Sequence, residues 1–314
     1  MAGSATFAAA LIQPWTAFGA GAGEANLETA RRHAVEAASR GARIVCFPES
    51  FPGDWRAPIA TTPLPELRDL ARELGVYLVA GYAEPIDDGG RRCHNALALI
   101  GPDGKEIGVY RRTLPAHAPW IYEGGSHWDF HWVPGHELPV FETDLGTIGL
   151  LMCSEIYAPE PARILALKGA ELILMPAGLT AGASSLVNTW RTLVWARAIE
   201  NLAYTAMCSN VVEEGRGGLA MLCSPEEIVL ESQAEGVHVA IVDLDRIRWL
   251  RSEQDRLVPD PKPWRTKPGV LRDWRRQALF DANPELTRVD DRLEDQATPS
   301  PPIVPAQLSS MRSG

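Results

Sequence analysis

Short apolar segments alternate with helix-like segments along most of the chain. Ala42 to Phe47 (ARIVCF) and Gly236 to Asp243 (GVHVAIVD) are examples of the apolar segments, and their composition is typical of buried strands. Between such segments, Glu24 to Gly41 and Thr189 to Leu202 carry apolar residues at helical spacing. Strands that are apolar on both faces need a covering layer on each face. The alternation therefore predicts a layered α/β domain.

The composition fits one globular domain with a short tail. The chain has 314 residues, of which 46% are hydrophobic and 22% are charged, and this excludes general disorder. The alternation predicts a single domain over residues 1–285. Residues 286–314 are rich in proline and serine towards their end, and we expect this tail to be partly mobile.

The charge of the chain argues against two classes of partner. Its 40 acidic and 30 basic residues give a net charge of −10, so no electrostatic attraction favours nucleic acid or an anionic membrane surface. No apolar segment reaches the roughly 18 residues that a membrane-spanning helix needs. We therefore expect a small-molecule substrate, with no nucleic-acid and no membrane partner.

The cysteines indicate a reducing compartment. There are five, an odd number, and none of them has the spacing of a zinc site or of a C-x-x-C motif. The N-terminal residues also lack the basic segment of a secretory signal. We expect free thiols and a cytoplasmic location.

Cys153 differs from the other cysteines in its local pattern. The predicted strand Gly146 to Met152 leads directly into it, and a helix begins within a few residues. Backbone N–H groups and the positive end of a helix dipole at such a junction favour the thiolate, which is the nucleophilic form. Cys46, Cys208 and Cys223 lie inside apolar strands, and we expect them to be buried packing residues.

Two charged side chains also follow predicted strands. Glu49 comes after Phe47-Pro48, and Arg112 comes at the end of the predicted strand Glu106 to Arg111. Loops at strand ends often carry functional residues. Taken singly, each position also fits a structural alternative. Cys153 fits a buried structural thiol, Glu49 an exposed acid in a turn, and Arg112 a solvated basic turn.

Together these segments resemble the nitrilase superfamily of carbon–nitrogen hydrolases. The match rests on Pro48-Glu49, on Gly149 to Glu155 (GLLMCSE) and on Arg197 to Asn201 (RAIEN), and it extends over roughly residues 5 to 285. The resemblance implies an αββα sandwich, here called nitrilase-like, which pairs into an αββα–αββα homodimer. A higher homo-oligomer is the alternative.

The resemblance also implies a mechanism. Cys153 would attack the substrate carbon to form a thioester, and Glu49 would act as the general base. Arg112 occupies the position of the family's usual lysine, in the segment Tyr110-Arg111-Arg112. Arginine stabilises negative charge but cannot release its proton at working pH. The implied activity is hydrolysis of a non-peptide, amide-type C–N bond. A nitrile or N-carbamoyl substrate and an impaired member with a binding role stay open.

Further residues are candidates for the same site. A second carboxylate is expected at Asp129 or Glu123, and the backbone N–H of Ser154 is a possible donor to the developing oxyanion. The region is also rich in aromatic residues and histidines, which can line a substrate pocket. The pocket candidates are Trp120, Trp128, His127, His131 and Tyr157.

One alternative is a metal-dependent enzyme. His127, His131 and His136 are spaced closely, with an aspartate between the first two, and histidine is a common zinc ligand. The family that the chain resembles uses no metal, so we expect none. The glycines at positions 19, 21 and 23 do not form G-x-G-x-x-G, and we expect no cofactor.

Overall fold

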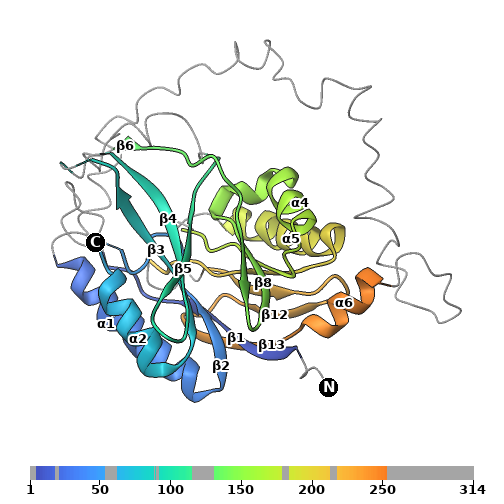
Figure 1. Ribbon diagram of the computed structural model, residues 1–314, viewed down its shortest axis with the longest axis horizontal. Coiled ribbons are helices and arrows are strands. Elements are labelled where there is room, and N and C mark those ends of the chain that lie inside the picture. The colour runs from blue at the N-terminus through green and yellow to red at the C-terminus, as the bar shows by residue number, and fades with distance from the viewer. Residues whose placement is uncertain are drawn as a thin grey trace, which may run out of the picture.

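The structure is a computed structural model that describes residues 5–17, 21–53, 62–87, 89, 92–114, 131–178, 184–212 and 218–252. The predicted domain end at residue 285 and the predicted tail lie outside these residues. Figure 1 shows how the elements are arranged. In chain order they are β1 (Thr6–Gln13), α1 (Ala22–Ser39), β2 (Ala42–Cys46), α2 (Leu64–Leu74), β3 (Tyr77–Pro85), β4 (Arg92–Ile100), β5 (Glu106–Arg111), β6 (His131–Trp132), β7 (Val140–Thr143), β8 (Gly146–Leu150), the 3₁₀ helix η1 (Cys153–Tyr157), α4 (Pro159–Leu167), β9 (Leu172–Leu174), α5 (Ser184–Asn201), β10 (Tyr204–Met207), β11 (Ala220–Cys223), β12 (Ile228–Ser232), β13 (Gly236–Asp243) and α6 (Leu244–Ser252).

The strands form two mixed sheets. The first has the order β13-β1-β2-β3-β4-β5, with β6 beside β4, and the second has the order β12-β11-β10-β9-β8-β7. The central strands β1, β2 and β3 are parallel in the first sheet, as are β8, β9 and β10 in the second. Antiparallel strands complete both sheets, except that β6 is parallel to β4. Parallel strands place their carboxyl ends at the same edge, and the functional loops start there.

The two faces of the first sheet bury different side chains. Along β1, Ala9 and Leu11 point into the core between the sheets, whereas Ala10 and Ile12 belong to the core under the helices. This alternation follows from the two-residue period of a strand. It explains why the strand segments are apolar throughout, as the sequence indicated.

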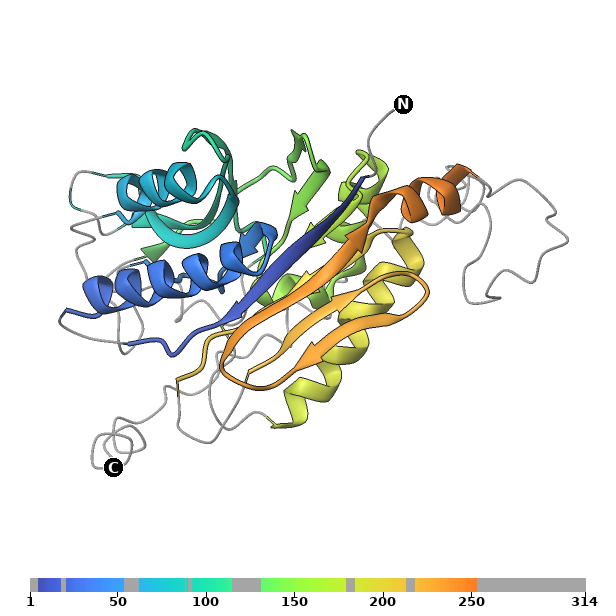
Figure 2. The same cartoon turned by 90° about the horizontal axis from the view of Figure 1, so that it is seen from below.

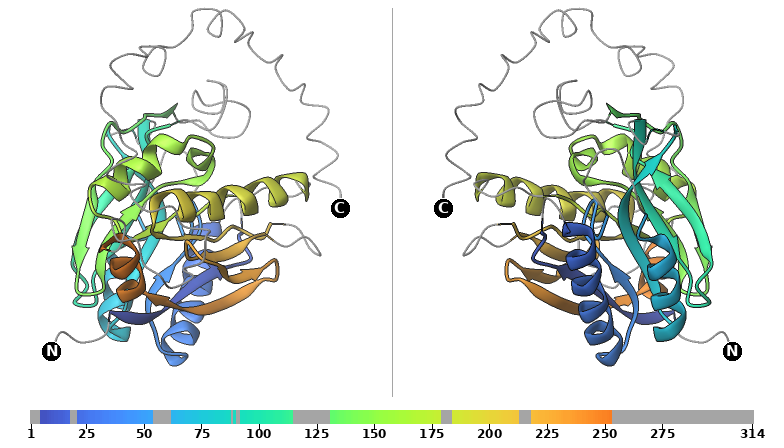
Figure 3. Two further views of the ribbon diagram at one scale, coloured as in Figure 1. Left: turned by 90° about the vertical axis from the view of Figure 1, so that its right-hand side faces the viewer. Right: turned by 90° about the vertical axis from the view of Figure 1, so that its left-hand side faces the viewer.

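The helices complete four layers. Helices α1 and α2 pack on the first sheet, and α5 packs on β10 and β11 of the second, with α4 beside α5. Figures 2 and 3 show α1 and α2 on one side of the paired sheets and α5 on the other. The predicted αββα sandwich is confirmed.

Two helices differ from the expectation. Helix α5 begins at Ser184, five residues before the predicted start at Thr189, and α6 was not predicted at all. In α6, Leu244, Ile247 and Leu250 are buried at a helical spacing, but the charged residues between them obscure the pattern. Among the described helices, none is long and apolar enough to cross a membrane.

Candidate active site

Loops from both sheets meet at one end of the sandwich. Glu49 follows β2 and Arg112 follows β5, both of the first sheet, whereas Cys153 follows β8 of the second. Beyond β9 and β10 the chain continues to Gly178 and Asn210, and both of these contact Glu49. The structure therefore brings the three predicted catalytic residues together at the carboxyl ends of strands.

Glu49 is held by three donors to its carboxylate. The residue is 7% exposed. Its Oε1 accepts hydrogen bonds from Asn95 Nδ2 and Arg112 Nη1, each at 2.8 Å, and its Oε2 accepts one from the Gly178 N–H at 2.8 Å. Asn210 Nδ2 donates to the Glu49 carbonyl at 3.0 Å. These bonds compensate for burial of the charge and fix the direction of the carboxylate.

A close backbone approach shapes the turn that carries Glu49. Ser50 has a φ of +56°, in the left-handed region that few residues other than glycine adopt. Gly81 of β3 lies directly against this turn, and a Cβ atom there would be 2.1 Å from the Ser50 nitrogen. Position 81 therefore has to be glycine if Glu49 is to keep its place.

The Arg112 guanidinium is buried and is fixed through all three nitrogens. Its side chain is 5% exposed. Nη1 donates to Glu49 Oε1 at 2.8 Å, Nη2 to Ser154 Oγ at 2.6 Å and Nε to the Leu114 carbonyl at 2.9 Å. Because the group is planar, three acceptors around it determine both its position and the orientation of its plane.

Cys153 is the first residue of η1 and has a φ of +55°. Its N–H donates to the Pro176 carbonyl at 2.9 Å, which anchors the turn to the end of β9. A non-glycine residue in this conformation is a strained position of the kind that is concentrated at functional sites. The thiol lies close enough to the Glu49 carboxylate for that negative charge to raise the pKa of the thiol.

The Cys153 thiol is neutral in this arrangement. Burial raises its pKa to about 12, the Glu49 carboxylate adds to this, and the Arg112 guanidinium and the Gly178 N–H oppose it only in part. We expected the helix dipole to favour the thiolate, and this expectation was wrong. The helix is a 3₁₀ helix of five residues, and burial and the carboxylate outweigh it.

Glu155 is a further site residue that the sequence analysis did not select. It is fully buried, and its carboxylate accepts hydrogen bonds from the Tyr110 hydroxyl, the Thr113 N–H and hydroxyl, the Leu114 N–H and the Met152 N–H. It thus joins the loop after Arg112 to the turn that carries Cys153. The sequence did contain a signal that could have identified Glu155, because this residue ends the GLLMCSE segment.

The remaining predicted residues divide into two groups. Ser154 lies in the site, with its hydroxyl on Arg112, whereas Tyr157 packs edge-on against Trp190 of α5 and accepts a hydrogen bond from it at 2.9 Å. Tyr157 is 47% exposed, so the structure places it on the outer surface rather than beside Glu49. The following lie outside the described residues: Trp120, Glu123, His127, Trp128, Asp129 and the side chain of His131.

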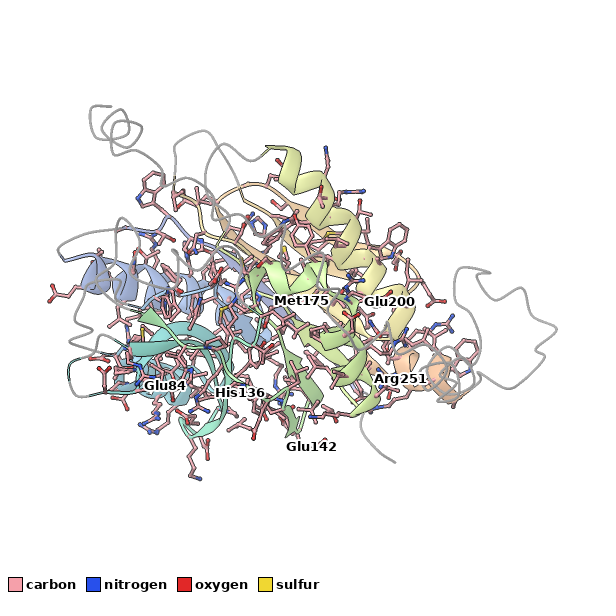
Figure 4. The ribbon with its side chains drawn as sticks, turned by 90° about the horizontal axis from the view of Figure 1, so that it is seen from above. Glu84, His136, Glu142, Met175, Glu200 and Arg251 are labelled. Atoms are coloured by element: carbon pink, nitrogen blue, oxygen red, sulfur yellow. The ribbon has the colours of Figure 1, made fainter. Side chains whose placement is uncertain are left out.

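The metal alternative stays untested. His136, labelled in Figure 4, is exposed, but the other two histidines lie outside the described residues or lack a described side chain. Within the described ranges, no three His, Cys, Asp or Glu side chains are grouped as metal ligands would be.

Three more residues at the site were not selected from the sequence. Asn95, Gly178 and Asn210 each donate to Glu49. Gly178 and Asn210 lie a few residues after the ends of β9 and β10, and loops at strand ends often carry functional residues. Asn95 carries no local signal, because it stands at an ordinary position inside β4. Met175, which Figure 4 labels in the interior, is buried at the end of β9 and precedes the Gly178 segment.

A four-layer sandwich with a thiol, a carboxylate and a cation at its strand ends defines a hydrolase of the nitrilase type. The sequence pattern described as "Carbon-nitrogen hydrolase" matches residues 8–252, and the chain belongs to this family. It is therefore a carbon–nitrogen hydrolase of the amidase and nitrilase type.

Individual relatives agree with this assignment. A deaminated glutathione amidase of Synechocystis is 27% identical over 252 residues, covering 74% of this chain and 91% of that protein. A nitrilase of Pyrococcus abyssi is 32% identical over 243 residues, covering 71% of this chain and 85% of the relative. The crystal structure of an amidase from Nesterenkonia sp. has the same fold, with a TM-score of 0.64, 24% identity, and coverage of 81% of this chain and 96% of the amidase.

Proposed function

We propose that this enzyme hydrolyses an amide through a thioester on Cys153, with Glu49 as the proton carrier and Arg112 as the charge-stabilising group. One observation carries the proposal: a single buried carboxylate is hydrogen-bonded to the Arg112 guanidinium and lies close enough to the Cys153 thiol to raise its pKa. Nucleophile, base and cation are thus contiguous, as acyl transfer requires.

The first step is attack on the amide carbon. Because the Cys153 pKa is about 12, the thiol has to lose its proton as the C–S bond forms, and the nearby Glu49 carboxylate takes it. The carbonyl electron pair moves onto oxygen. The Arg112 guanidinium lies beside the thiol–carboxylate pair and stabilises the resulting negative charge.

Collapse of this intermediate and hydrolysis complete the cycle. Glu49 returns its proton to the leaving nitrogen, the C–N bond breaks, and ammonia or an amine departs. Water then attacks the thioester carbon as Glu49 takes its proton. The C–S bond breaks as Glu49 returns that proton to the Cys153 sulfur, which releases the carboxylic acid and restores the neutral thiol. Arg112 cannot transfer a proton at working pH, so Glu49 carries out every proton transfer in this scheme.

An amide is preferred to a nitrile as the substrate on the strength of the relatives. The Synechocystis and Nesterenkonia proteins are named amidases, and the Pyrococcus protein is named a nitrilase.

For location and assembly, we infer a cytoplasmic homodimer. The five cysteines, all free, support a reducing compartment, and exposed Tyr157 and Ile164 support a partner surface near α4.

The test is a covalent adduct. Intact-mass spectrometry of the protein incubated with a panel of short aliphatic and aromatic amides, and of matching nitriles, should show a covalent adduct that Cys153→Ala abolishes, an acyl thioester from an amide or a thioimidate from a nitrile. Cys93→Ala is the matched control, because Cys93 is buried in β4, and the adduct should persist. Absence of an adduct with every amide and nitrile would refute the proposal. Light scattering during gel filtration tests the homodimer.

A further inference from the structure

The Ser154 side chain is an acceptor for the Arg112 guanidinium. Its hydroxyl oxygen accepts the hydrogen bond from Arg112 Nη2 at 2.6 Å, since a guanidinium donates only. Of the three acceptors named above for Arg112, Glu49 is the proposed base and the Leu114 acceptor is a backbone carbonyl. The Ser154 hydroxyl is the one side-chain acceptor among these three without a proposed chemical step.

The position of that hydroxyl is itself fixed. Ser154 stands between Cys153, whose N–H is bonded to the Pro176 carbonyl, and Glu155, whose carboxylate is bonded to Met152 and to the loop after Arg112. A residue held on both sides within a five-residue 3₁₀ helix has a fixed Cα–Cβ direction, which leaves three staggered positions for its hydroxyl, and the hydrogen bond from Arg112 occupies one of them. Ser154 Oγ therefore provides a fixed reference point for the guanidinium.

An arginine side chain at position 112 depends on a fixed acceptor more than a lysine side chain would. A guanidinium is planar, so its effect on a developing charge depends on the orientation of its plane, whereas an ammonium is a compact charge without one. Arginine and serine at these two positions thus form one functional unit.

We propose that Ser154 is a positioning residue which orients the Arg112 guanidinium towards the oxyanion formed at Cys153. This inference rests on the proposed function. The inference goes beyond the proposed function because it assigns a role to the Ser154 side chain rather than to its backbone N–H. That role depends on arginine being present at position 112.

The test compares two reactions of the same thiol. 4-Nitrophenyl acetate acylates a cysteine through a tetrahedral oxyanion, whereas iodoacetamide alkylates it without one. Ser154→Ala should slow acylation by roughly tenfold, the effect of one lost hydrogen bond to a charged group. Alkylation should stay within about twofold of the wild-type rate, because Asn95 and Gly178 still hold Glu49 in place against the thiol.

Three further variants complete the test. Ser154→Thr keeps the hydroxyl and should restore the acylation rate. Ser154→Ala in the Arg112→Lys background should change that rate by less than about twofold, because an ammonium has no plane to orient. Ser39→Ala, which removes an exposed hydroxyl at the end of α1, is the control and should have no effect.

The outcomes separate this inference from the proposed function. The positioning role is wrong, while the thioester mechanism stands, if Ser154→Ala leaves acylation unchanged or slows both reactions equally. It is also wrong if Ser154→Ala acts as strongly in the Arg112→Lys background as it does alone. If the wild-type protein forms no acyl adduct at Cys153 at all, both the positioning role and the proposed function are wrong.

Discussion

The Tyr110 hydroxyl donates to both carboxylate oxygens of Glu155, at 2.6 and 2.5 Å. Tyr110 belongs to β5 of the first sheet, and Glu155 follows β8 of the second, so this contact crosses between the sheets. Both side chains are fully buried. Burial and the adjacent carboxylate raise the pKa of Tyr110, which keeps the phenol as a donor.

Tyr110→Phe removes this contact and should lower the free energy of unfolding by about 1.5–3 kcal/mol, the range for a hydrogen bond to a charged group. Urea denaturation measures the change. Tyr77→Phe is the control, because its hydroxyl also contacts a carboxylate, but Asp144 is 61% exposed. That variant should lose less than about 1 kcal/mol. Equal losses would contradict a special role for the buried pair.

Glu49→Gln should change how alkylation of Cys153 by iodoacetamide depends on pH. With a thiol pKa of about 12, only about one molecule in 100,000 is a free thiolate at pH 7, so the wild-type rate depends on transfer to Glu49 and should be nearly flat from pH 6 to 9. The variant lacks this route, and its rate should be lower at pH 7 and rise about tenfold per pH unit.

The same variant should overtake the wild type at high pH. Removing the negative charge of Glu49 removes one cause of the raised thiol pKa, so the thiolate forms at lower pH. Glu73→Gln, in an exposed ion pair with Arg31, should behave as the wild type. A steep wild-type profile identical to that of Glu49→Gln would rule out the proton transfer.

Arg112→Lys should slow acylation by 4-nitrophenyl acetate by roughly 10- to 100-fold. The single nitrogen of lysine cannot replace three donors, so the acceptors on Ser154 and Leu114 lose the hydrogen bonds from Arg112. Arg111→Lys is the matched control: this neighbour is exposed and paired with Glu84, and its variant should stay within about twofold. A faster Arg112→Lys enzyme would mean that the arginine impairs the reaction.

Gly81→Ala should impair both stability and activity. The added Cβ would be 2.1 Å from the Ser50 nitrogen, so the turn that carries Glu49 has to shift. We expect a loss of about 2 kcal/mol or more in unfolding free energy and at least roughly tenfold in acylation rate. Gly89→Ala adds a Cβ at an exposed position, with no atom of the described residues closer than 3.7 Å, and should be neutral. A fully active Gly81→Ala protein would contradict this account of the turn.

The layered fold could be predicted because its signal is local. The strand Gly236–Asp243 has the predicted bounds, and the strand Ala42–Cys46 ends one residue before the predicted Phe47, since an apolar segment with a clear end marks each of them. Glu49, Arg112 and Cys153 were also found locally, because each follows a strand. Their proximity was inferred from the resemblance and is a consequence of the two sheets ending together.

The contacts around these residues could not be predicted in the same way. The hydrogen bonds from Asn95 and Gly178 to Glu49 join positions 46 and 129 residues apart. The raised pKa of Cys153 likewise depends on burial and on Glu49, which approaches it from the other sheet. A one-dimensional pattern locates the helix that follows Cys153 but contains no information about how deeply the thiol is buried.

The division of the site between two sheets has a consequence for how this enzyme tolerates mutation. Glu49 and Arg112 move with one sheet and Cys153 with the other, and apolar side chains such as Leu97 and Leu150, packed in the core between the sheets, set the spacing between them. A core substitution far from the thiol therefore acts as an active-site substitution. The catalytic rate therefore depends sensitively on the distance between the two sheets. Core substitutions should lower this rate before they unfold the protein.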